Sequence, residues 1–90
     1  MSPELSRFNG IRVMMFKDDH NPPHFHAETA EFEASYRIST LELLDGKLPR
    51  RAEELVLEWA EKHRQELADN WFSLADGGTF QKIVPLGDEE

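Results

Sequence analysis

One run of nine residues in the first third of the chain concentrates the side chains that could do chemistry. This run, His20-Asn21-Pro22-Pro23-His24-Phe25-His26-Ala27-Glu28, holds three of the four histidines in the sequence. Imidazole is the commonest metal ligand among protein side chains, and it also changes charge near physiological pH. The sequence therefore indicates a functional site in this segment.

The spacing of the histidines suits a metal site. His24 and His26 are two residues apart on a predicted strand, so their side chains project from the same face. His20 can reach that face from a loop that two prolines stiffen. Glu28 and Glu33 lie on or near that face. Histidines and a carboxylate with open positions are typical of zinc hydrolases and of non-haem iron or manganese sites. In this interpretation the three histidines bind a divalent ion such as zinc, manganese, iron or nickel, with either glutamate as a further ligand or base.

The same segment is also a candidate surface for recognising a protein. In this interpretation the imidazoles lie on the solvated face of a hairpin, and the loop contacts a protein partner or a second copy of the chain. The residues predicted to contact the partner are Asn21, Pro22, Pro23 and Phe25. The sequence favours a non-enzymatic partner-binding or regulatory module and keeps a metal-dependent hydrolase or nuclease as the alternative.

Composition narrows the class of protein. A chain of 90 residues makes one domain, residues 1–90, because a single core serves this length. The absence of cysteine excludes disulfides and thiolate metal sites. A net charge of −8 repels a phosphate backbone, so nucleic acid is not expected to bind the isolated chain. No apolar run approaches the ~20 residues of a membrane span, and the start is not that of a signal peptide, so we expect a cytoplasmic protein.

The first half of the chain predicts a short antiparallel sheet. We expect a loose lead-in over residues 1–10, a central strand over 11–16 that is covered on both faces, and two paired strands between His24 and Ile38. A two-residue loop at Thr29-Ala30 would place Phe25 opposite Ala34, whereas a longer loop would shift the register, since Thr-Ala is a poor turn sequence.

The second half predicts one long amphipathic helix. Apolar residues recur at intervals of three and four over residues 50–76, and we expect a bend near residues 69–70, because a straight helix would be about 40 Å long. A short edge strand over 79–84 and an acidic tail over 87–90 follow.

Together these elements predict an α+β fold in which an antiparallel sheet of three to four strands packs against the helix. One group of residues is expected to form the core on the sheet side: Phe25, Ala27, Phe32, Ala34, Tyr36 and Ile38. A second group is expected to face it from the helix: Leu55, Val56, Trp59, His63 and Leu67.

Several segments resemble a known family, and together they extend over nearly the whole chain. They are Phe8-Asn9-Gly10-Ile11, Asp19 to Ala27, Leu48-Pro49-Arg50-Arg51, Leu57-Glu58-Trp59-Ala60 and Ile83-Val84-Pro85-Leu86. These segments resemble the bacterial domain-of-unknown-function family 4160, whose signature matches His20 to His26. The resemblance implies a small stand-alone bacterial protein without an established activity, of a kind often suspected of belonging to toxin–antitoxin-like gene pairs. It assigns no ligand or catalytic role to the matching residues.

Overall fold

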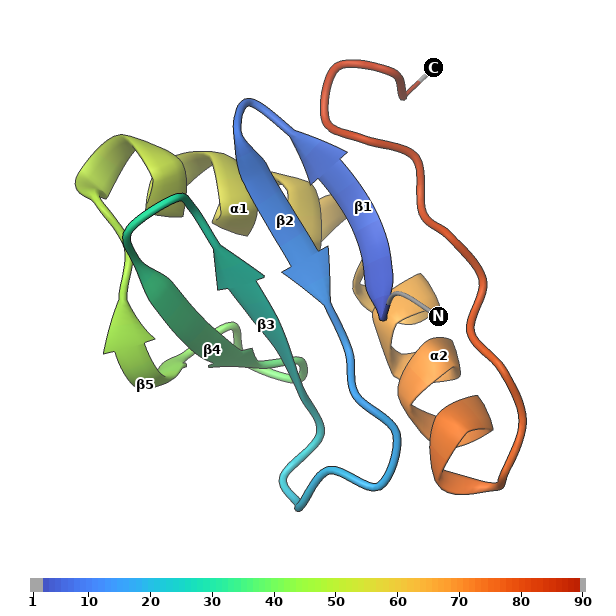
Figure 1. The fold of residues 1–90 in the computed structure, drawn as a ribbon. Helices are drawn as coiled ribbons and strands as arrows, with labels where there is room; N and C mark the ends of the chain where they lie inside the picture. The colour runs from blue at the N-terminus through green and yellow to red at the C-terminus, as the bar shows by residue number, and fades with distance from the viewer. Residues whose placement is uncertain (1–2, 90) are drawn as a thin grey trace.

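The computed structural model describes residues 3–89 and consists of one antiparallel sheet followed by two helices (Figure 1). The strands are β1 (Glu4–Phe8), β2 (Ile11–Met14), β3 (His24–Glu28), β4 (Glu33–Arg37) and β5 (Leu43–Lys47), and the helices are α1 (Arg50–Lys62) and α2 (Arg64–Ala75). The strands lie side by side in chain order. The α+β class is confirmed, while the described residues form five strands and two helices instead of the predicted three to four strands and one helix.

Strand β1 corrects the prediction of a loose lead-in over residues 1–10. It pairs with β2 through a tight turn at Asn9 and Gly10, whose φ angles are 51° and 76°. Two positive φ angles in succession define the turn that matches the twist of a hairpin, and Asn-Gly is its most favourable sequence. Leu5 and Phe8 are buried and fix the strand to the core.

The β3–β4 hairpin has a different register from the one that a two-residue loop would give. Phe25 lies opposite Tyr36, and Ala27 lies opposite Ala34. The reason is a longer turn, in which the Thr29 amide donates to the Phe32 carbonyl and the Phe32 amide donates to Thr29 Oγ1. A shift of two residues keeps every side chain on its predicted face. Phe32, however, lies in the turn and is 37% exposed, which corrects its predicted burial.

The predicted single helix is interrupted at His63, not near residues 69–70. His63 has φ −119° and ψ 24°, and its amide donates to the carbonyls of Trp59 and Ala60, which ends α1. The buried imidazole packs on Trp59 and bonds the carboxylates of Glu66 and Glu89. As a result α1 covers one face of the sheet, while α2 runs down beside the loop between β2 and β3 (Figure 1).

The core lies between α1 and the sheet face that α1 covers. Trp59 is fully buried, and its indole contacts the rings of Phe8 and Phe25. The opposite face of the sheet, which we call the front face, carries the side chains that alternate with this core set. Neither helix in the described part of the chain is long and apolar enough to cross a membrane.

The segment after α2 is extended but is not the predicted edge strand over residues 79–84. It runs beside β1 with one backbone hydrogen bond to that strand, from the Ile83 amide to the Leu5 carbonyl. Side chains supply other bonds: Asn70 pairs with both backbone groups of Gln81, and the Trp59 indole donates to the Val84 carbonyl at 2.8 Å. Hydrogen bonds from the helix side chains Asn70 and Trp59 therefore hold this segment in place of a full set of backbone bonds to β1. Of the predicted acidic tail, Glu90 lies outside the described residues.

Replacing Trp59 with Ala is expected to destabilise the protein by about 3–5 kcal/mol, because it removes a buried indole and leaves a cavity. That loss is a large part of the ~5–15 kcal/mol of a typical domain. Urea denaturation followed by circular dichroism measures the change. Leu43→Ala, at a side chain that is 44% exposed, serves as the control and should change the stability by less than about 0.5 kcal/mol. Equal effects of the two substitutions would contradict the central place of Trp59.

Candidate metal site

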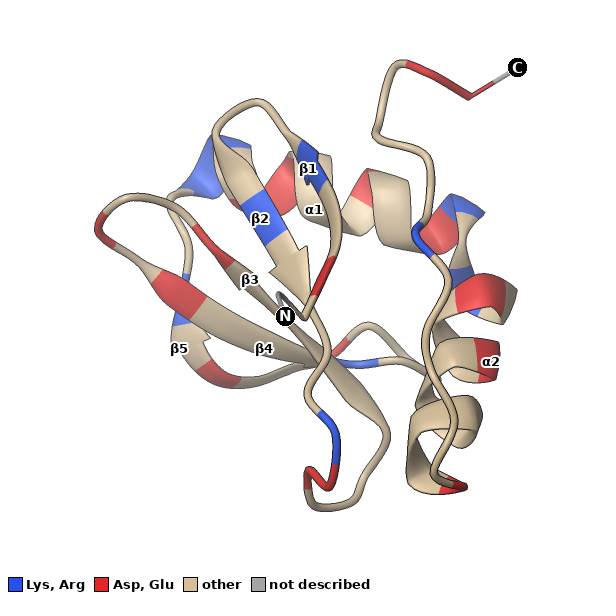
Figure 2. Cartoon of the chain, turned by 45° about the vertical axis from the view of Figure 1, so that its right-hand side comes forward, with Lys and Arg blue, Asp and Glu red and all other residues tan. Residues whose placement is uncertain are grey.

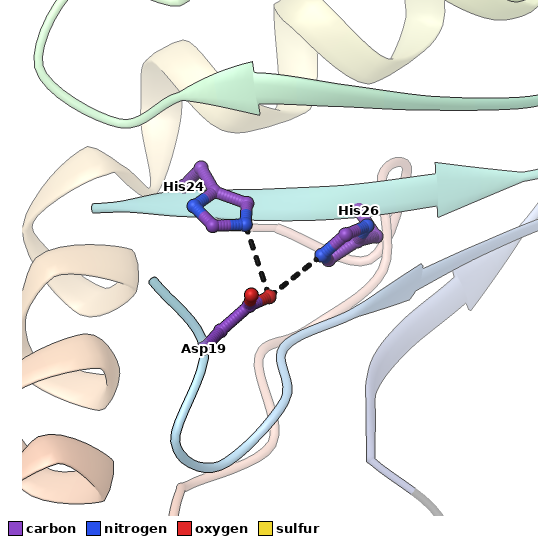
Figure 3. A group of neighbouring side chains, drawn as sticks. All are labelled: Asp19, His24 and His26. Carbon is purple, nitrogen blue, oxygen red and sulfur yellow. Dashed lines mark hydrogen bonds and ion pairs between the residues drawn. The ribbon is translucent and has the colours of Figure 1, made fainter. Parts of the chain in front are cut away.

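Asp19, His24 and His26 converge at the lower end of the front face (Figure 3). The Nε2 atoms of His24 and His26 each lie 3.0 Å from Asp19 Oδ2. One potential ligand atom from each residue lies within 4.8 Å of the other two. Among residues 3–89 this is the one group of three histidine, cysteine or acidic side chains that converges in this way.

Strand β3 aims the two imidazoles at the same point. Phe25 and Ala27, which alternate with the two histidines, are fully buried in the core. The side chains of His24 and His26 must therefore both project from the front face. Asp19 comes from the loop between β2 and β3, where Asp18 adopts the left-handed conformation with φ 63°. Short acidic side chains tolerate this conformation, and the bend turns the carboxylate of Asp19 back toward the strand.

Hydrogen bonding determines which nitrogen of His24 carries its proton. Nδ1 lies 2.7 Å from the carbonyl oxygen of Pro22, and because a carbonyl can only accept, Nδ1 must be the donor. In a neutral ring Nε2 then has a free lone pair that faces the carboxylate oxygen of Asp19. Two acceptors 3.0 Å apart repel each other unless a proton or a metal ion lies between them.

The imidazoles of the site pack against aromatic rings and are partly shielded from water. His24 is 2% exposed, and its ring packs on Trp71 of α2 with a centroid distance of 5.2 Å. The ring of Phe16 meets the His26 ring edge-on at 4.8 Å. Aromatic rings on two sides therefore hold the imidazoles in place.

The carboxylate of Asp19 has a pKa below its ordinary value. Burial raises this pKa, but the hydrogen bond from His26 Nε2, the bond from the His20 amide and the adjacent imidazoles together lower it by more. A depressed pKa keeps the group ionised at neutral pH, as a metal ligand requires.

His20 lies outside the convergent group, although the sequence suggested it as the third nitrogen ligand. Its side chain is 83% exposed, and Nδ1 lies 3.3 Å from Asp19 Oδ1, the carboxylate oxygen that does not face the other histidines. The bend at Asp18 turns Asp19 inward and leaves His20 in solvent. The third residue of the convergent group is instead Asp19, which was not among the predicted ligands.

The two predicted glutamates are also outside the group. Glu28 shares the face of His26 but forms an ion pair with Arg12, which in turn pairs with Glu4. Glu33 is exposed and lies opposite Glu28 in the hairpin, at the far end of β3 from the cluster.

The predicted partner-contact residues divide into two kinds. Asn21 is exposed, and Pro22 and Pro23 are half-buried, so all three are accessible in the loop. Phe25 is fully buried in the core, where it stacks on Tyr36, and it cannot contact a partner.

Comparison with known proteins identifies the chain by family. A family model described as a domain of unknown function, DUF4160, matches residues 10–72. That match covers well over half of the sequence and includes Asp19, His24 and His26, and the chain belongs to this family. No curated protein and no solved structure matches the chain.

The ion pairs that Glu4 forms with Arg7 and Arg12 make the stability of the protein pH-dependent. Hydrogen bonds from Arg7 and then from Arg12 lower the pKa of Glu4 from its ordinary 4.5 to about 2. A carboxyl whose pKa is lower in the folded state stabilises the protein above its unfolded pKa and loses this contribution as the pH falls toward the folded pKa. Protonation of Glu4 should therefore destabilise the fold between about pH 4.5 and pH 2.

Replacing Glu4 with Gln should lower the free energy of unfolding at pH 7, and the difference from the wild type should shrink as the pH falls through that window. Urea denaturation at a series of pH values measures this. Glu31→Gln is a matched control, because Glu31 is exposed and forms no ion pair among the described residues. A difference between Glu4→Gln and wild type that stays constant from pH 7 to pH 2 would contradict the assignment.

Proposed function

We propose that this member of the DUF4160 family binds a divalent transition metal through Asp19 Oδ2 and the Nε2 atoms of His24 and His26. The observation that carries the proposal is the convergence of two imidazole nitrogens on one carboxylate oxygen, each at 3.0 Å. Two histidines and one carboxylate, with further positions open, form a common ligand set for iron(II) and related ions.

The distances between the carboxylate oxygen and the two imidazole nitrogens are short enough for all three atoms to bind one ion. Adjacent ligands of an octahedral ion with bonds of ~2.1 Å lie ~3.0 Å apart, whereas tetrahedral geometry requires ~3.4 Å. Both oxygen–nitrogen distances are 3.0 Å. These distances are also those of ordinary hydrogen bonds, so they do not select the ion, and we expect manganese, iron(II), cobalt or zinc to bind with small movements of the three side chains.

The surroundings of His24 support the same proposal. A metal-binding histidine usually donates its other ring nitrogen to a carbonyl or carboxylate, which orients the ring and leaves the ligating nitrogen unprotonated. The bond from Nδ1 to the Pro22 carbonyl does this for His24.

Three protein ligands leave positions for water or a substrate, so the reaction class that the site supports is metal-dependent hydrolysis. A bound ion would act there as a Lewis acid and would lower the pKa of a bound water. Glu28 is not the base in this proposal, because Arg12 holds its carboxylate. Nucleic acid is disfavoured as the substrate by the net charge of −8.

A role as a partner-binding or regulatory module is the second candidate. It is favoured by an apolar groove beside the Pro22-Pro23 loop, which is described below. Membership of a toxin–antitoxin-like gene pair, as the family resemblance implies, belongs to this candidate. A cytoplasmic location is proposed under both candidates.

Metal titration of chelator-treated protein tests the first proposal. At a hundredfold excess over the dissociation constant, the ion should stabilise the fold by about 2.7 kcal/mol. For a domain of this size that corresponds to a rise in melting temperature on the order of 10 °C. We expect manganese, iron(II), cobalt or zinc to produce this rise, with cobalt also giving a visible absorption band.

Substitutions locate the site. Asp19→Asn and His26→Gln should weaken metal affinity by at least about tenfold, while His20→Gln should bind the ion as the wild type does. Denaturation of the metal-free variants shows separately whether they fold. The proposal is wrong if none of these ions raises the melting temperature, or if folded Asp19→Asn binds as tightly as His20→Gln.

A further inference from the structure

An open apolar groove lies between α2 and the loops that flank the end of the sheet. Its lining includes Pro23, Ile38 and Ala68, with Phe72 beside them, and its volume is about 490 Å³. Phe72 is 64% exposed, the highest value among the exposed large hydrophobic residues in the described chain. Its neighbour Trp71 is buried against His24, so the helix turns one aromatic ring inward and the next one into solvent.

No described segment of the chain covers this groove. The C-terminal segment passes on the opposite side of α2, where Asn70 holds Gln81 and Ser73 bonds the carbonyl of Thr79. It then continues along β1, where the Trp59 indole holds the carbonyl of Val84. The helix face that carries Ala68 and Phe72 therefore remains without an intramolecular partner among residues 3–89.

The charge around the groove indicates what kind of molecule fits it. The one basic residue in the lining, Arg64, is already engaged, because its guanidinium donates to the Ser39 carbonyl and pairs with Glu61 at 2.6 Å. Asp69 is exposed, and its bonded partner is the neutral amide of Gln65. Figure 2 shows acidic residues along α2 and no basic residue beyond its first turn. No acidic residue lines the groove itself, but Asp69 stands at its edge, bonded to the lining residue Gln65. Because Glu61 offsets the charge of Arg64, the edge of this apolar groove carries a net negative charge from Asp69.

This distribution argues against three classes of occupant. A second copy of the chain would bring another −8 charge to an acidic surface, and like charges across an interface are costly. Nucleic acid and anionic membranes are repelled in the same way. A cationic protein segment is attracted to the rim and can bury an apolar side chain at the centre.

We propose that this groove docks a basic segment of a partner protein, which inserts an apolar or aromatic side chain beside Phe72 and places lysine or arginine near Asp69. Interface energy is typically concentrated in a few central apolar anchors surrounded by a polar rim, and the groove has this arrangement. This proposal does not rest on the proposed metal site, because no residue that lines the groove is a proposed metal ligand.

A model peptide provides a direct test. The probe is a twelve-residue amphipathic peptide of leucine and lysine, compared with a peptide in which glutamate replaces lysine. In an NMR titration of the full chain, the lysine peptide should shift the amide signals of the residues next to Pro23, of Ile38 and of residues 64–72. The glutamate peptide should not bind. Affinity should fall as salt is added.

Matched variants separate docking from general attraction to an acidic protein. Phe72→Ser should weaken binding about tenfold, whereas Leu43→Ser, at another exposed apolar side chain on β5, should leave it unchanged. Asp69→Asn should weaken binding several-fold at low salt. Because the side chains of Phe72 and Leu43 are both exposed, neither substitution should unfold the protein, and melting curves check this.

Three results would overturn the proposal. The first is an equal effect of Phe72→Ser and Leu43→Ser on peptide affinity. The second is a set of shifts that lies outside the groove. The third is a wild-type chain that is dimeric in sedimentation and becomes monomeric with Phe72→Ser, which would assign the groove to a second copy.

Discussion

The burial of Trp59 is the interaction on which the rest of the structure depends. Its ring packs on β1 through Phe8 and on β3 through Phe25, and its indole nitrogen holds the C-terminal segment at Val84. One side chain therefore connects the sheet, α1 and the last part of the chain. It also fixes the orientation of β3, because Phe25 can contact Trp59 only if the neighbouring histidines leave the opposite face. The candidate site is in this sense a consequence of the core.

The break at His63 provides the second constraint. A helix that continued straight from α1 would not run beside the β2–β3 loop, and Trp71 would not reach the ring of His24. The buried imidazole of His63 bonds Glu66 in α2 and Glu89 near the C-terminus, so the change of direction is held by side chains at both ring nitrogens. The core residue that ends one helix thus places the next helix against the candidate site and leaves Phe72 in solvent.

Local patterns in the sequence were sufficient to predict part of this arrangement. The alternation from His24 to Glu28 predicted one face for both histidines, and the repeat in the second half predicted burial of Val56, Trp59 and Leu67. Asn9-Gly10 is a favourable hairpin sequence, and the prediction of a loose lead-in over residues 1–10 overlooked it, so β1 was missed.

Other features depend on contacts between distant residues. At the helix break His63 contacts Glu89, 26 residues away, and no local period can indicate such a contact. The inward direction of Asp19 depends on the backbone conformation of Asp18 and on the distance across a loop. For the same reason the sequence singled out three histidines, whereas the structure brings together two histidines and an aspartate.

The loop before β3 is where the proposed metal site and the proposed docking groove meet. The Pro22 carbonyl orients the ring of His24, and the next residue, Pro23, lines the groove and accepts a hydrogen bond from the Ile38 amide. An ion held by His24 and a peptide packed on Pro23 would each restrict the same short segment. The two bound groups would therefore lie on neighbouring residues of one backbone segment. The two proline residues, which carry no chemistry of their own, are the part of the signature segment that serves both proposed sites, because Pro22 orients a ligand of the first and Pro23 lines the second.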